Sequence, residues 1–110
     1  MNINGLARGL MSSRKSGEEF YLHVVNCIEQ QLKEWNEDYE EAIVMKLGNA
    51  DYQLMIRNKE QVYCVALSQQ EIESLQKSSP YALDHFLWKQ LEKQGLPIKR
   101  GFGNYIDAVL

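Results

Sequence analysis

The stretch that decides the fold is A-I-V-M-K-L-G-N-A-D-Y-Q-L-M-I-R-N-K-E-Q-V-Y-C-V-A-L, residues 42–67. It contains a short apolar run with β-branched residues at 42–47, an alternating run at 52–57 and a third, mostly apolar run at 61–67, separated by the turn sequences G-N-A-D and N-K-E. Glycine favours turns because it readily adopts left-handed backbone conformations, and asparagine and aspartate do so because their side chains also hydrogen-bond to the nearby backbone. Because links this short join antiparallel neighbours, the stretch predicts a three-stranded antiparallel meander.

The third run differs from the second in how its apolar residues are distributed. Residues 52–57 alternate Tyr, Leu and Ile with Gln, Met and Arg, whereas residues 61–67 are apolar at almost every position. Since successive strand residues point to opposite faces, the third strand is apolar on both of its faces. We therefore expect it to be covered on both sides or to lie at an oligomer contact.

A helix is predicted to precede the meander. Residues 16–19 read S-G-E-E, and a serine followed three residues later by glutamate is a capping box. The apolar residues behind it fall within an arc of about 140° on a helical wheel. They are Phe20, Tyr21, Val24, Val25, Ile28, Leu32 and Trp35. We expect an amphipathic helix that ends within residues 36–38.

Two further helices are predicted after the meander. Residues 68–71, S-Q-Q-E, form a second capping box and predict a short helix to about Lys77. The pair Ser79 and Pro80 suggests a new helix with serine as its cap and proline at the first helical position, running to residue 94. Gly95 followed by an apolar residue is typical of a helix C-terminus.

The order of elements predicts a small single domain of the α+β class: a helix, a three-stranded antiparallel meander, two helices and a short C-terminal strand or tail. The chain has 110 residues, enough for one domain. Residues 1–15 are rich in Gly, Ser and Asn, and we expect a flexible N-terminal arm there. The domain is then expected to span residues 16–110.

Composition indicates a cytoplasmic protein that does not enter a membrane. No apolar run approaches the roughly 18 residues needed to span a bilayer, and the N-terminus lacks the pattern of a signal peptide. The net charge is -3, whereas nucleic-acid binders usually carry a basic surplus. Cys27 and Cys64 both lie in apolar surroundings, where small buried thiols are expected rather than a disulfide.

No catalytic motif is found in the sequence, so we expect no enzyme, no catalytic residue and no cofactor. A zinc hypothesis would use His23, Cys27, Cys64 and His85, of which the first two are one helical turn apart. The set has no close C-x-x-C pair, and His23 lies outside the apolar arc of its helix. We therefore predict no metal site.

The C-terminal stretch K-R-G-F-G-N-Y, residues 99–105, raises the question of nucleic acid. R-G-F-G resembles the start of the motif of RNA-recognition sheets, but Asn104 stands where the next stacking aromatic belongs. Residues 68–105 resemble the helix-turn-helix and wing of bacterial winged-helix repressors. That resemblance implies a recognition helix at 79–94 and a wing at 99–105, although the helix carries mixed charges.

The predicted function is therefore that of a regulatory or adaptor module acting by contact with another protein or with a second copy of itself. DNA binding by residues 68–105 is the alternative. Aromatic residues at the margins of the apolar faces are candidate interface anchors, together with two basic residues near the C-terminus. The candidate binding residues are Trp35, Tyr63, Trp88, Lys99, Arg100, Phe102 and Tyr105.

Overall fold

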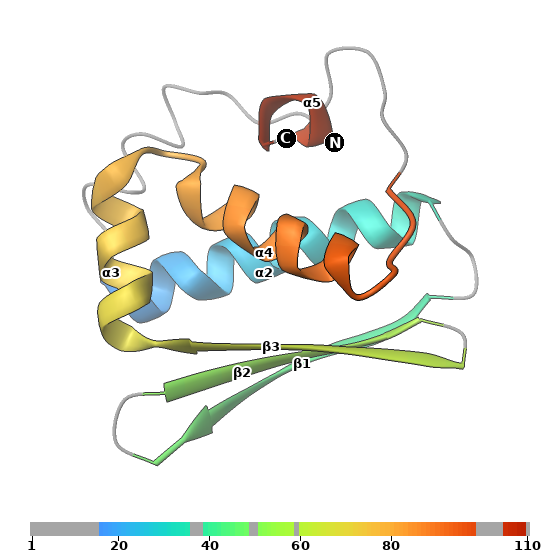
Figure 1. Cartoon of the computed structure of the whole chain (residues 1–110), viewed down its shortest axis with the longest axis horizontal. Helices are drawn as coiled ribbons and strands as arrows, with labels where there is room; N and C mark the ends of the chain where they lie inside the picture. The colour runs from blue at the N-terminus through green and yellow to red at the C-terminus, as the bar shows by residue number, and fades with distance from the viewer. Residues whose placement is uncertain (1–15, 36–38, 49–50, 59, 99–104, 110) are drawn as a thin grey trace.

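The computed structural model describes residues 16–35, 39–48, 51–58, 60–98 and 105–109. A three-stranded sheet carries all the described helices on one of its faces (Figure 1). This is the predicted α+β domain, with the elements in the predicted order. They are α2 (Gly17–Trp35), β1 (Tyr39–Leu47), β2 (Asp51–Asn58), β3 (Gln61–Ser68), α3 (Gln69–Ser78), α4 (Ala82–Lys93) and α5 (Tyr105–Val109).

The predicted meander is confirmed. The strands lie in the order β1-β2-β3, and both neighbouring pairs are antiparallel. Val44 pairs with Leu54, and Leu54 pairs in turn with Val65, so that one row of side chains crosses the sheet beneath the helices. The pairing of β1 with β2 is irregular between Tyr39 and Glu41, and β1 and β3 form the two edges.

Helix α2 begins after Ser16, the predicted cap, but the reciprocal hydrogen bond of a capping box goes to the serine hydroxyl instead of its backbone N–H. The backbone N–H of Glu19 donates to Ser16 Oγ at 3.2 Å, and Ser16 Oγ in turn donates to the Glu19 carboxylate. The predicted apolar face is buried except for Trp35, which is half-buried. This face packs with the inner faces of the strands and with α4 into one core whose fully buried members include Phe20, Ile28, Leu54, Ile56, Leu83 and Leu87.

The second capping box is confirmed in both of its hydrogen bonds, but the start of the following helix was wrongly predicted. Ser68 accepts a hydrogen bond from the N–H of Glu71, whose carboxylate accepts one from the N–H of Ser68. Ser79 does not cap α4, because its extended backbone ends α3 instead. Pro80 then lies in a turn closed by the Ala82 N–H and the Ser79 carbonyl, so α4 begins at Ala82.

The glycine-terminated end of α4 is as predicted. Gly95 has a φ of 100°, a left-handed conformation that side-chain-bearing residues rarely adopt. Its N–H donates to the Glu92 carbonyl at 3.0 Å, and that of Leu96 donates to the Leu91 carbonyl at 3.1 Å. Leu96 is buried, so this turn returns the chain to the core.

The end of the chain forms a helical turn rather than the short strand that was one of the two expectations. In α5, Tyr105, Ile106 and Val109 are buried, and the carbonyl of Val109 accepts a hydrogen bond from His85 Nδ1 on α4 at 2.8 Å. The predicted N-terminal arm, residues 1–15, lies outside the described residues. No helix within the described part of the chain is long and apolar enough to cross a membrane.

Candidate functional site

The face of the sheet that points away from the helices is the first candidate (Figure 1). Because strand side chains alternate, residues whose neighbours fill the core point outward on this side. Its outward side chains, which we call the open sheet face, are Glu41, Ile43, Met45, Gln53, Met55, Arg57, Val62, Cys64 and Ala66.

Strand register arranges the open sheet face in rows across the three strands. The central row joins Ile43, Met55 and Cys64, and the next row joins Met45 and Ala66 through Gln53. An antiparallel sheet with one solvated face normally has polar residues on that side. The open sheet face departs from this pattern, because apolar side chains occupy its centre.

Strand β3 contributes the most exposed part of this surface. Tyr63, Val65 and Leu67 are buried on its inner face, whereas Val62, with 51% of its surface exposed, lies outward. The sequence predicted that both faces of this strand would be covered or in contact with a partner. Within the described domain only the inner face is covered.

Both edges of the sheet carry a helix-derived side chain that occupies backbone hydrogen-bonding groups. At the β3 edge, Gln94 Oε1 accepts from the N–H of Cys64 at 3.0 Å, and Gln94 Nε2 donates to the Cys64 carbonyl at 2.6 Å. At the β1 edge, the Glu29 carboxylate accepts from the N–H of Ala42 at 3.1 Å. Occupied edge groups hinder pairing with another strand, so these contacts oppose extension of the sheet.

Charges on the open sheet face are concentrated at one end and are of both signs. The guanidinium of Arg57 lies 3.6 Å from the Glu40 carboxylate and 3.5 Å from the Glu41 carboxylate. These groups are exposed, so the ion pairs contribute little to folding stability. The positive charge of Arg57 is therefore compensated by neighbouring carboxylates on the same surface.

Several predicted interface aromatics are core residues in this structure. Trp88 and Tyr105 are fully buried, and Tyr63 is buried on the inner face of β3. The Trp88 ring lies 5.6 Å from that of the half-buried Trp35 and 6.3 Å from that of Tyr105. Trp35, Trp88 and Tyr105 therefore pack together where α2, α4 and α5 meet, and the three buried aromatics present no surface to a partner in this fold.

A buried polar chain links α4 and α5 within that aromatic cluster. The Trp88 indole N–H donates to the Tyr105 hydroxyl at 3.2 Å, and the hydroxyl donates to the Asp84 carboxylate. Burial, and then the nearby Asp84 carboxylate, raise the pKa of Tyr105 well above its usual range. The phenol therefore stays protonated as a donor to the buried carboxylate.

The residues of the zinc hypothesis do not come together. Cys27 is buried on α2, where its sulfur lies 3.7 Å from His23 Nε2, whereas Cys64 is exposed on the open sheet face. His85 instead binds the Val109 carbonyl. Across the described ranges, no three His, Cys, Asp or Glu side chains are grouped as metal ligands, and both cysteines are free thiols.

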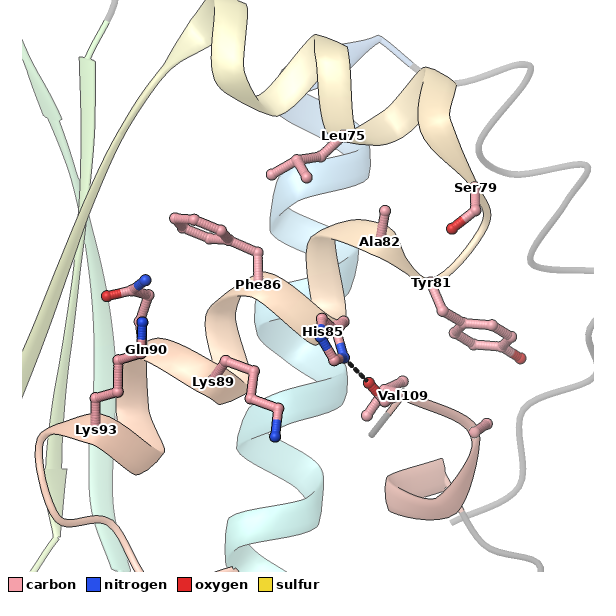
Figure 2. A pocket seen from close by; sticks show the side chains of 11 residues that line it. Leu75, Ser79, Tyr81, Ala82, His85, Phe86, Lys89, Gln90, Lys93 and Val109 are labelled. Atoms are coloured by element: carbon pink, nitrogen blue, oxygen red, sulfur yellow. Dashed lines mark hydrogen bonds between the residues drawn. The ribbon is translucent and has the colours of Figure 1, made fainter.

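A groove between α3, α4 and α5 is the second candidate (Figure 2). Its volume is about 720 Å³. The groove is lined by apolar side chains from all three helices and by cationic and amide side chains of α4. The described residues that line it are Leu75, Ser79, Tyr81, Ala82, His85, Phe86, Lys89, Gln90, Lys93, Ala108 and Val109.

The alternative DNA-binding prediction concerns the same helix. The side of α4 that is not in the core holds His85, Lys89 and Lys93, which line the groove, together with the exposed Glu92, whereas Asp84 is buried with the apolar face. Of the predicted wing, Tyr105 is the buried first residue of α5, whereas residues 99–104, which include the candidate residues Lys99, Arg100 and Phe102, lie outside the described residues. Their proposed contacts stay predictions.

Sequence reasoning missed the contacts made by Gln94, at the end of α4, and by Glu29, within α2, because nothing in the local sequence of a polar helix residue indicates a contact with a distant strand edge. It also missed the groove, because Trp88 was expected at the margin of an apolar face, whereas Trp88 is buried and Phe86 is the half-buried aromatic of α4. The apolar outer face of β3 was the one signal of the open sheet face that the sequence carried.

Comparison of the chain with models of protein families, with curated proteins and with solved structures gives no match in any of the three.

Proposed function

We propose that this domain acts by protein contact, and that the contact is self-association of two copies through the open sheet face. The observation that carries the proposal is that β3 is apolar on both faces while the described helices cover only one. Val62, Cys64 and Ala66 remain exposed on the other. Contiguous apolar surface of this kind is typical of sites that bind another protein.

The arrangement of the face suits sheet-on-sheet packing. Two sheets stacked face to face lie about 10 Å apart and interdigitate their facing side chains. Flexible methionine side chains at Met45 and Met55 fit such packing, because an unbranched thioether adapts to the shape of its neighbour. The apolar rows would then be removed from water in the same way as the inner face already is.

The occupied sheet edges support contact through the face rather than through strand addition. A partner strand at the β3 edge would have to displace both hydrogen bonds of Gln94, and one at the β1 edge would have to displace that of Glu29. The open sheet face has no comparable obstacle among the described residues.

A second copy is the occupant that the charges favour. A homodimer uses the same patch on both subunits, so a patch with a strong single-sign charge would repel itself. Here Arg57 is matched by Glu40 and Glu41 within the same subunit, and the two rows beyond them are uncharged. The patch is therefore compatible with itself.

The test is sedimentation of the protein over a range of concentrations. We expect the weight-average mass to rise from one subunit to two as concentration increases. Val62→Glu, which places a charge within the interface, should weaken self-association at least about tenfold. Leu22→Glu is the matched control, because Leu22 is a similarly exposed apolar residue (46%) on α2 rather than on the sheet.

Two results would contradict the proposal. One is a protein that stays a single subunit across the whole concentration range. The other is a Val62→Glu variant that associates as the unmodified chain does, since the contact would then lie elsewhere. Loss of association in Leu22→Glu alone would point to α2 as the contact surface.

A further inference from the structure

The groove between α3, α4 and α5 combines an apolar floor with a cationic side. Leu75 of α3, with Ala82 and Phe86 of α4, supplies apolar surface, and Val109 of α5 lies beside His85 (Figure 2). A volume of about 720 Å³ lies within the range of clefts that bind small molecules. The groove and the open sheet face have no lining residue in common, so the groove is separate from the proposed interface.

The cationic side is built by helical spacing. His85, Lys89 and Lys93 follow one another at intervals of four residues on α4, which brings them to the same side of the helix. No carboxylate occurs among the described residues that line the groove, although the chain as a whole has a net charge of -3. Lys89 has an exposed ion pair with Glu92 at 3.5 Å, outside the lining.

We propose that this groove binds a small apolar carboxylate. The aromatic or aliphatic body would lie on Leu75, Ala82 and Phe86, and its carboxylate would lie toward Lys89 and Lys93. The complementarity has two parts that a single ligand must satisfy together: removal of apolar surface from water and neutralisation of the lysines. A neutral apolar molecule satisfies only the first, and a small polar anion only the second.

His85 gives the site a fixed wall. Its Nδ1–H donates to the Val109 carbonyl at 2.8 Å, which ties α5 to α4 beside the lysines (Figure 2). The position of the imidazole is therefore set by the fold before any ligand binds. Such pre-organisation lowers the entropic cost of binding, because this side chain need not be ordered by the ligand.

The experiment uses the fluorescent probe 8-anilinonaphthalene-1-sulfonate, an apolar monoanion, and a matched pair of competitors. We expect the probe to bind and 1-naphthaleneacetate to displace it at least about tenfold more effectively than the neutral 1-naphthaleneacetamide. The double variant Lys89→Gln/Lys93→Gln should lose this preference, whereas Lys33→Gln/Lys46→Gln, which removes the same charge outside the groove, should keep it.

Further variants locate the bound probe. Ala82→Trp should fill the groove and reduce probe binding, while Val62→Glu should leave it unchanged, because the open sheet face is elsewhere. Equal displacement by the acid and the amide would overturn the proposal, as would unchanged binding in the Lys89/Lys93 variant. Loss of binding in Val62→Glu would also overturn it, since the probe would then report the sheet face; self-association is measured separately by sedimentation.

Discussion

The side-chain amide of Gln94 binds the backbone of Cys64 through both of its polar atoms, at 3.0 Å and 2.6 Å. The two residues are thirty positions apart. Gln94 follows α4, at the position where the helix ends before Gly95. The contact therefore occupies the edge of β3 with a side chain whose position depends on the packing of α4 against the sheet.

Gln94→Ala should lower the free energy of unfolding by about 1 kcal/mol, because the N–H and carbonyl of Cys64 lose their protein partner but regain water at an exposed edge. Urea denaturation measures the change. Gln70→Ala, at an exposed position on α3, is the control and should be near neutral. Sedimentation should show unchanged pairing of subunits, and loss of pairing in Gln94→Ala would mean that the β3 edge takes part.

Tyr21 and Tyr105, both fully buried, should respond differently to loss of the hydroxyl. Tyr105→Phe removes the donor to the buried Asp84 carboxylate and should cost about 1–3 kcal/mol. Tyr21→Phe should be neutral or stabilising, because the buried Tyr21 hydroxyl has no hydrogen-bond partner in the described structure. Denaturation of the two variants side by side measures the two losses in the free energy of unfolding. A larger loss in Tyr21→Phe than in Tyr105→Phe would refute this prediction.

Alkaline pH should destabilise the domain through the same phenols. Burial, and then the neighbouring Tyr52, raise the pKa of Tyr21 from 10.0 to about 12. Below pH 10 the phenol is protonated in both folded and unfolded chains, so it adds no pH dependence. Between the two values the unfolded chain releases the proton first, and stability falls as pH rises.

Denaturation at several alkaline pH values measures this loss. Tyr21→Phe should make the decline with pH shallower over the same interval, while the contribution of Tyr105, whose pKa is also raised, should remain. An unchanged slope in Tyr21→Phe would show that its phenol does not titrate differently in the folded and unfolded chains.

Gly95→Ala should destabilise the domain by about 1 kcal/mol, because a φ of 100° is strained for a residue with a Cβ. Among the described residues, no atom beyond Gly95 and its two chain neighbours lies within 4 Å of where that Cβ would stand, so backbone strain rather than a clash would be the cause. Thermal or urea unfolding tests the change. A stabilised Gly95→Ala variant would contradict this account of the turn.

Local signals in the sequence were sufficient for the architecture. Ser16 and Ser68 cap helices through neighbours three residues away, and the turns of the meander depend on their own residues. The start of α4 was predicted too early because a serine–proline pair such as Ser79 and Pro80 is found both at helix starts and in turns. Which of the two forms depends on how α4 packs, and that is not written in the pair itself. The C-terminal turn likewise depends on tertiary contacts such as that of Tyr105 with Asp84.

The candidate sites were predicted less well, since they depend on helical phase and on distant partners. A rotation of α4 that buries Trp88 also brings Phe86 and the lysines to the groove, and no pattern within one helix fixes that rotation. The contact of Gln94 with Cys64 joins residues with no shared local motif. The apolar outer face of β3 was visible because strand alternation alone reveals it.

The most direct test of the central claim is the rate at which N-ethylmaleimide modifies Cys64, followed by mass spectrometry at low and high protein concentration. Cys64 is exposed on the open sheet face, whereas Cys27 is buried and serves as the slow internal reference. If two copies pack through this face, modification of Cys64 should slow several-fold between about 1 µM and about 200 µM protein, following the dimer population by mass action. Val62→Glu should abolish that slowing, and an equal Cys64 rate at both concentrations in the unmodified chain would contradict the account.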